Sequence, residues 1–407
     1  MAARRTPLVL LCALLALPLT LSCKGGKRGE PDIKPVSEDN AEWVATPVVG
    51  DKSRRNRRAC NPALASLERL DDLTSETQLP AHYISQQLRG RGKGTTMAWI
   101  GEADERLGRV DDGQARDVAL INSLIDQSES ERASAPRNLV AIITQIRALV
   151  FLEMRRLLGE VVDGQVEGAE AKTAWTAAGC LFLESLTPLT QRADAIAGED
   201  WTQSIRDAYA QGIVGLRDDI VRSKVAKQQI EKSMYGVAYR LIVAAAEERT
   251  ARGANEALGL LDMIEDRLAD RNGPGLARMR RAFNGPPEKI DAAMVERELA
   301  VAFTKRARKY CDKAALGGEV GQPDAIAETW EGIVYTKVIL ASMREALAAE
   351  GFDADAYMAD WQRYLEAVEG SDVDAASEIS PRLVEWNCAF QEHLKIAECS
   401  SSSNEPE

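Results

Sequence analysis

The chain has 407 residues, and its 51 Lys and Arg are outnumbered by 63 Asp and Glu, which gives a formal net charge of −12. Contact with a nucleic-acid backbone needs a concentrated basic surface, so this balance argues against a nucleic-acid partner. The length is enough for two domains of ordinary size.

The first 22 residues have the three parts of a secretory signal peptide. Arg4 and Arg5 form the positive start, residues 6–21 are an uncharged apolar run, and Ser22 is a small residue before a cleavage point. The run of about 16 residues is shorter than the roughly 20 that a membrane-spanning helix needs. We therefore expect residues 1–22 to be removed. Without Arg4 and Arg5 the mature chain has 51 − 2 = 49 basic and 63 acidic residues, a net charge of −14.

The cysteine at position 23 indicates what kind of signal this is. The sequence LTLSC at residues 19–23 resembles the lipobox of bacterial lipoproteins, with Thr20 where Leu is commonest. The resemblance implies cleavage before Cys23 and acylation of its sulfur (palmitate) and of its new amino group. At about 0.8 kcal/mol per buried CH₂, several acyl chains anchor a protein stably in a membrane. The alternative is an ordinary signal peptide followed by an incidental cysteine.

The residue after Cys23 is Lys24, whereas Asp in this place is the usual inner-membrane retention signal of the family. The resemblance therefore implies a protein anchored in the outer membrane and facing the periplasm. Residues 23–59 have the charged, Gly- and Pro-containing composition of a flexible linker. The basic stretch within it, KSRRNRRAC, contacts anionic lipid headgroups or is simply solvated. Residues 400–407 are expected to be a disordered tail.

Between these ends the hydrophobic spacing predicts an all-α protein, because it follows the helical period and no run has the period of a strand. Pro136 fits the first turn of a helix, Pro323 and Asp324 mark another start, and Gly351 is typical of a C-cap. The helices are expected within 101–127, 137–158, 167–188, 201–250, 254–270, 291–314, 324–350, 355–368 and 376–398.

The two halves of the helical region share short segments in the same order. We interpret this as an internal duplication that produces two tandem antiparallel bundles, at 60–225 and 226–399; the alternative is one irregular helical array. The pattern from 201 to 248 lacks a strong break, which predicts one long helix joining the halves, and loop signals in RNGPG and NGPP add a turn to the second half. The matching landmarks are Gly113 and Gly253, Phe151 and Phe303, Trp175 and Trp330, and Trp201 and Trp361.

The mature chain keeps six of the 7 cysteines, and five remain if Cys23 is lipidated, so at least one thiol should be free in the oxidising periplasm. Cys180 lies in an apolar helical segment and is the candidate for a buried free thiol. Cys388 and Cys399 fall in one predicted helix about 16 Å apart along its axis. This exceeds the limit of about 7 Å between bridged Cα atoms, so we expect them not to pair with each other. Cys311 with Cys388, and Cys60 with Cys399, are the open alternatives.

Catalytic and metal-binding motifs are not found in the sequence, so we predict no catalytic residue, cofactor or metal ligand. The stretch LRGRGKGTT has the wrong spacing for a phosphate-binding loop, and neither His82 nor His393 belongs to a ligand or nucleophile motif. Asp353 and Asp355 are interpreted as a helix N-cap. The adjacent acids Glu247 with Glu248, and Glu265 with Asp266, are interpreted as solvated faces. Eight aromatic residues are expected in the core: Trp99, Phe151, Trp175, Trp201, Phe303, Trp330, Trp361 and Trp386.

These observations predict a non-catalytic envelope lipoprotein that binds or scaffolds other envelope proteins from the periplasmic side of a membrane. One alternative is a binder of a small ligand, haem or metal that serves an uptake system and requires a concave pocket. Another is an enzyme whose site is built from carboxylates with perturbed pKa values. The sequence leaves the two alternatives open.

Overall fold

The computed structural model describes residues 61–75, 80–90, 94–396 and Cys399. The predicted signal peptide at 1–22, the lipidated Cys23, the linker at 23–59 and the tail at 400–407 lie outside the described residues. Helices make up most of the described chain, and a single pair of two-residue strands is its only sheet. The all-α prediction is confirmed.

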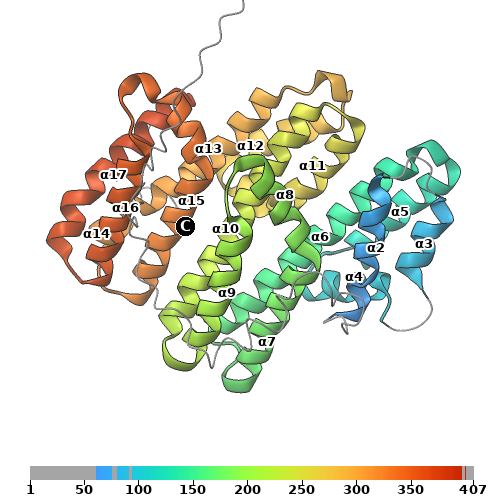
Figure 1. The fold of residues 1–407 in the computed structure, drawn as a ribbon, viewed down its shortest axis with the longest axis horizontal. Coiled ribbons are helices and arrows are strands. Elements are labelled where there is room, and N and C mark those ends of the chain that lie inside the picture. The colour runs from blue at the N-terminus through green and yellow to red at the C-terminus, as the bar shows by residue number, and fades with distance from the viewer. Residues whose placement is uncertain (1–60, 76–79, 91–93, 397–398, 400–407) are drawn as a thin grey trace, which may run out of the picture.

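The elements follow one another through short turns (Figure 1). The first group is α2 (Ser66–Asp72), α3 (Ala81–Arg89), α4 (Thr96–Arg106), β1 (Val110–Asp111), β2 (Gln114–Ala115), α5 (Arg116–Ser130), α6 (Ala135–Val162), α7 (Gly168–Leu181), α8 (Thr187–Ala197) and α9 (Trp201–Asp218). The second group is α10 (Ile220–Glu248), α11 (Ala251–Met263), α12 (Glu265–Phe283), α13 (Ala292–Tyr310), α14 (Lys313–Gly317), α15 (Pro323–Ala346), α16 (Ala354–Glu369) and α17 (Val373–His393). A π-helical turn at Phe182–Leu186 joins α7 to α8, and short 3₁₀ turns lie at Pro62–Leu64, Leu73–Ser75, Arg132–Ser134, Pro287–Lys289 and Ala348–Glu350.

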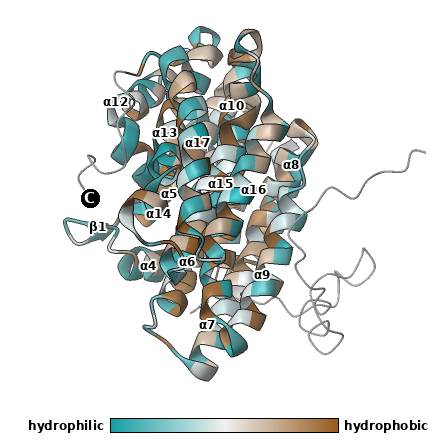
Figure 2. Cartoon of the chain, turned by 90° about the vertical axis from the view of Figure 1, so that its left-hand side faces the viewer, coloured by the Kyte–Doolittle hydropathy of each residue, from teal (hydrophilic) through white to brown (hydrophobic). Residues whose placement is uncertain are grey.

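Helix α10 is the centre of the fold. It packs along α9 and α15 and also contacts α8, α11 and α13. Figure 1 shows it between α13 and α15 on one side and α6 on the other. The buried apolar side chains form one continuous cluster from Ala63 to Leu394, and the ribbon in Figure 2 alternates between hydrophilic and hydrophobic residues along the helices, as expected when each helix buries one face.

Helix α6 combines length and apolar character. The segment Arg132–Val162 has the length and hydropathy of a membrane span, but 78% of its apolar window is buried within the fold. It packs against α5, α7 and α11, so it serves as a core helix. The predicted boundary between the two bundles, at 225/226, lies inside α10. Helices α6 and α11 pack together although they belong to different predicted bundles. The division into two bundles therefore stays a prediction.

The expected single helix from 201 to 248 is wrong. Asp219 has extended backbone angles (φ −161°, ψ 98°) and its side chain accepts a hydrogen bond from the Val221 N–H at 3.0 Å, so it ends α9 and caps α10. The two helices then fold back on each other. Gly215 permits this close approach, because a Cβ there would lie 2.6 Å from the Ser223 Oγ.

The expected helix over 101–127 is also interrupted. Residues 107–115 form a tight hairpin between α4 and α5, with Val110 paired to Ala115. Gly108, Asp112 and Gly113 all have positive φ angles (65°, 51° and 77°), which an α-helix cannot contain. Asp112-Gly113 is a dipeptide typical of hairpin turns, and the helical interpretation of 101–127 did not take it into account.

Several local predictions are confirmed. Pro136 lies in the first turn of α6 and Pro323 opens α15. The Asp353 carboxylate caps α16 by accepting from the N–H groups of Asp355 and Ala356 at 2.9 and 3.1 Å. Within RNGPG the backbone breaks at Asn272 and kinks α12. Gly351 has a φ of 80° and ends the turn after α15.

The aromatic landmarks are core residues, as predicted. Six of them are buried, and Trp330 and Trp386 are partly buried and pack against the same cluster. Their fit depends on small neighbours, since a Cβ on Gly332 would lie 2.6 Å from the Trp361 ring. The six buried residues are Trp99, Phe151, Trp175, Trp201, Phe303 and Trp361.

The cysteine predictions are wrong in two places. Cys388 and Cys399 form a disulfide with their Cα atoms 5.3 Å apart, because α17 ends at His393 and the chain reverses at Lys395, whose φ is 58°. Cys180 is disulfide-bonded and not a free thiol. The free cysteine among the described residues is Cys311, which is buried, so the expectation of at least one free thiol is confirmed. These findings also exclude the suggested pairs of Cys311 with Cys388 and of Cys60 with Cys399.

Candidate functional site: a charged cavity at α6, α10 and α12

A cavity of about 480 Å³ opens where α6, α10 and the α11–α12 junction meet the hairpin after α4. The lining residues of α6 and of α10 are three or four positions apart, which places them on one face of each helix. Eight of the ten lining residues carry a charge. They are Leu107 and Arg109 before β1, Leu152, Arg155 and Arg156 on α6, Lys227 and Glu231 on α10, Asp262 on α11, and Glu265 and Asp266 on α12.

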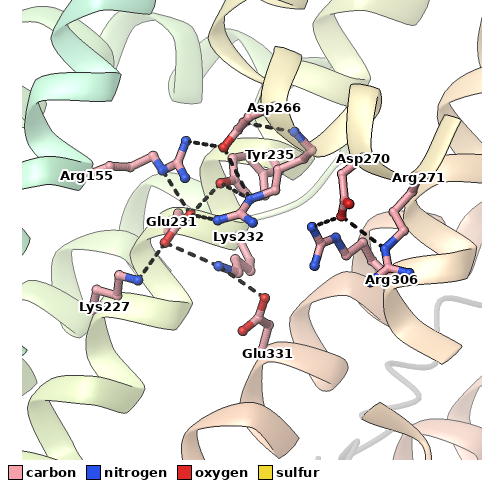
Figure 3. A network of polar contacts seen from close by, with 11 residues as sticks. Arg155, Lys227, Glu231, Lys232, Tyr235, Asp266, Asp270, Arg271, Arg306 and Glu331 are labelled. Atoms are coloured by element: carbon pink, nitrogen blue, oxygen red, sulfur yellow. Dashed lines mark hydrogen bonds and ion pairs between the residues drawn. The ribbon is translucent and has the colours of Figure 1, made fainter. Parts of the chain in front are cut away.

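The Glu231 carboxylate is the centre of the charge network (Figure 3). It is 1% exposed and pairs with four cations: Arg155 Nε at 2.9 Å, Lys227 Nζ at 3.1 Å, Lys232 Nζ at 3.2 Å and Arg267 Nη2 at 3.2 Å. Burial disfavours the ionised carboxylate, but the four cations prevail and hold the pKa of Glu231 well below its usual value. Glu231 is therefore an anion at any physiological pH.

Lys232 lies behind Glu231, away from the cavity lining. Its side chain is 2% exposed, and its Nζ is 3.3 Å from Glu331. The ammonium is 5.6 Å from the Tyr235 ring centroid and 5.8 Å from that of Tyr335, which is cation–π geometry. Burial lowers the pKa of Lys232 in spite of its carboxylate partners. With no access to the cavity, this lysine stabilises the network and does not touch a ligand.

The negative charges of Asp262 and Glu265 in the cavity wall are neutralised by arginines that do not line the cavity. Arg280 donates to Asp262 at 2.5 Å and to Glu265 at 2.9 Å, and Arg116 donates to Asp262 at 3.4 Å. Burial raises the pKa of Asp262 against the effect of both arginines. For Glu265 burial is outweighed by the hydrogen bond and charge of Arg280, which lower its pKa. The Asp266 carboxylate accepts a hydrogen bond from Arg155 Nη1 at 3.0 Å.

A second buried acid pair lies behind Arg109. The guanidinium donates to the Asp117 carboxylate at 2.8 and 3.2 Å, and Gln145 donates to the same carboxylate at 2.8 Å. Asp104 accepts from the Asp117 N–H at 2.9 Å, and its other oxygen has no hydrogen-bond partner among the described residues. Burial and the adjacent Asp117 raise the pKa of Asp104 to about 7. Both acids are fully buried and outside the cavity lining, so their effect is to orient Arg109.

None of the cavity residues was predicted from the sequence. The interpretation of Glu265 as a solvated acid is wrong, because it is partly buried and accepts from Arg280. Asp266 is exposed as expected, although it also lines the cavity and accepts from Arg155. Glu247 and Glu248 are exposed as expected. The local sequence carries no strong signal, because Glu231 and Lys232 follow the polar residues 227–229 and precede the apolar stretch that begins at Met234. The predicted functional residue, Cys23, lies outside the described residues.

No protein-family model, no curated protein and no solved structure matches the chain. In the part of the chain that the structure describes, no group of three or more His, Cys, Asp or Glu side chains is placed to hold a metal ion. The fold and the cavity therefore define the protein only as an all-α protein with a charged cavity beside its central helix.

Proposed function

We propose that the protein is a non-catalytic lipoprotein of the bacterial envelope, anchored through Cys23, that binds a small polar molecule in the charged cavity. The signal at residues 1–22 and the lipobox resemblance support the anchor, and residues 23–59 provide a linker. Lys24 supports the outer membrane, facing the periplasm, as the location.

The cavity is the observation that carries the binding function. Its volume of about 480 Å³ falls within the range of about 300–1,000 Å³ of small-molecule sites. Its eight charged residues suit a polar molecule and provide a poor environment for haem, whose ring needs apolar walls. A small polar ligand is thus favoured over haem.

The pairing of the carboxylates supports a non-catalytic role. A general acid or base must be able to exchange a proton with the substrate. Glu231, Asp262, Glu265 and Asp266 each bind at least one arginine or lysine. Asp104, whose pKa burial raises to about 7, does not line the cavity. Asp262 lines it and also has a raised pKa, but its carboxylate is ion-paired with Arg280 and Arg116.

A scaffold for other envelope proteins, the first expectation from the sequence, has less support. A docking surface needs a contiguous apolar patch of several hundred Å². The exposed large apolar side chains of the described residues belong to six different elements: Val110, Leu120, Ile196, Ile220, Leu316 and Val373. We therefore favour the ligand-binding role.

We further propose that the two halves arose by duplication. The matched landmarks Phe151 and Phe303 lie on α6 and α13 and pack against the same residue of the central helix, Tyr235. The ring centroids are 5.7 and 6.4 Å from that of Tyr235. Equivalent helices on either side of α10 are what a duplicated bundle would contain.

Native mass spectrometry of the lipidated protein extracted gently from its own envelope tests the binding function. We expect a non-covalent adduct that is released on denaturation. Leu152→Trp, which fills the cavity from one apolar wall, should lose the adduct. Leu120→Trp, at an exposed position of α5 outside the cavity lining, should keep it. A wild-type mass equal to that of the lipidated chain alone, or an adduct retained by Leu152→Trp, contradicts the proposal.

A further inference from the structure

The charges around Glu231 do not balance. The ion-paired cluster contains four cations, namely Arg155, Lys227, Lys232 and Arg267, and three carboxylates, namely Glu231, Asp266 and Glu331. Three tyrosines touch this region, but burial raises the pKa of each, so they add no negative charge. One positive charge in the cluster is therefore uncompensated.

The neighbouring charges hold no surplus of cations. Arg116 and Arg280 face Asp262 and Glu265. Arg109 faces Asp117 and, at 3.8 Å, Asp104. Arg106 and Arg156 face Glu153, Glu160 and the exposed Glu102. The surplus of positive charge is thus local to the Glu231 cluster, and the neighbouring acids are paired with arginines of their own.

Lys227 is the residue of this cluster whose ammonium group brings the excess positive charge to the cavity wall. In the described part of the chain its ammonium has one ion-pair partner, Glu231 at 3.1 Å, and its side chain is 21% exposed. That carboxylate already serves three other cations. An ammonium carries three donors, so Lys227 keeps N–H groups that can face a ligand. Lys232 and Arg267, by contrast, have further carboxylate partners on the protein.

Arg155 adds a second donor to the same place. Its Nε is ion-paired with Glu231 and its Nη1 donates to Asp266, and among the described residues its Nη2 has no hydrogen-bond or ion-pair partner. In Figure 3 Arg155 and Lys227 lie on one side of the Glu231 carboxylate and Lys232 on the other. Leu107 and Leu152 give the cavity an apolar portion for the carbon part of a ligand.

We propose that the cavity binds a small organic molecule through a single anionic oxygen group, a carboxylate or a phosphate monoester, held by Lys227 and Arg155. This inference rests on the proposed ligand-binding function and names its ligand class. One negative charge completes the cluster, whereas a cation would add to the existing surplus. An oxyanion also accepts the N–H donors that the protein leaves free.

A ligand-observed NMR titration of the full lipidated protein in detergent micelles tests the proposal. The probes are butyrate, methyl phosphate and the neutral isostere butyramide. We expect at least one anion to bind and butyramide not to bind; the tighter of the two anions identifies the oxyanion. Lys227→Met should weaken anion binding by at least about tenfold, which is the usual effect of losing one charge-assisted hydrogen bond. Lys227→Arg should retain anion binding.

Lys224→Met is the matched control. Lys224 lies on the same helix but pairs with Asp324 and does not line the cavity, so anion binding should be unchanged. Binding of neither anion, equal binding of butyramide, or an unaffected Lys227→Met variant would overturn the inference. A neutral or cationic adduct in the native mass spectrum would also overturn it while leaving the proposed binding function intact.

Discussion

The most demanding prediction concerns the Glu231 carboxylate. Glu231→Gln keeps the size of the side chain and removes the negative charge that four cations share. Two of these cations are deeply placed: Lys232 is 2% exposed and Arg155 is 18% exposed. The substitution therefore leaves excess positive charge inside the protein, with Glu331 and Asp266 as the remaining acids.

The magnitude follows from the geometry. Unit charges about 4 Å apart interact by about 4 kcal/mol each at an effective dielectric constant of about 20. Desolvating the carboxylate offsets much of that sum, and removing one partner from a buried ion pair costs about 3–5 kcal/mol net. Gln can still accept from Tyr235 or one arginine, so we expect a loss near about 3 kcal/mol in the free energy of unfolding.

Urea unfolding followed by tryptophan fluorescence and circular dichroism measures this loss. Glu247→Gln is the control on the same helix, because Glu247 is exposed, and it should change stability by less than about 0.5 kcal/mol. The double variant Glu231→Gln with Lys232→Met should recover part of the loss, with a coupling energy of about 1–3 kcal/mol. A Glu231→Gln variant as stable as the Glu247→Gln control would refute the reasoning.

Three further predictions concern the core and the buried acids. Gly332→Ala should lower the free energy of unfolding by about 1–3 kcal/mol, because the new Cβ would lie 2.6 Å from the Trp361 ring. In the control Gly159→Ala the nearest atom is 3.9 Å away, so that variant should be neutral or more stable by up to about 1 kcal/mol. Equal urea midpoints for the two variants would contradict this. The pKa of Asp104 rises from 3.8 to about 7 on folding, so the folded state holds the extra proton and wild-type stability falls as pH rises between these values. Asp104→Asn should therefore gain stability relative to wild type between pH 5 and pH 8, measured by urea unfolding at each pH, and a pH-independent difference would count against it. Cys311 is buried and burial raises its pKa to about 12, so maleimide labelling should require unfolding; rapid labelling of the native protein would show that the site is open.

The fold class could be predicted because hydrophobic spacing reports the helical period directly. Helix breaks that depend on the backbone angles of a single residue could not be predicted from this spacing. Asp219 turns the chain back between α9 and α10, and Lys395 reverses it after α17, which brings Cys399 beside Cys388. Neither residue interrupts the hydrophobic period strongly, so the pattern continues through the break and predicts one helix where there are two segments.

The candidate site was hidden for a different reason. Its charges come from separate helices that only the tertiary fold brings together, such as Arg155 on α6, Lys227 on α10 and Asp262 on α11. On each helix alone, charged residues three or four positions apart have the pattern of a solvated face. The spacing shows which residues share a face, but it does not show whether that face meets water or another helix.

The anchor at Cys23 is the claim on which location, mature length and access to an envelope ligand all depend. Mass spectrometry of the amino-terminal peptide from the protein expressed in its own bacterium tests it directly. We predict a chain that begins at Cys23 and carries acyl chains on both its sulfur and its amino group, and a Cys23→Ala variant that keeps its uncut signal peptide. An unmodified Cys23, or cleavage at another position, would contradict the account.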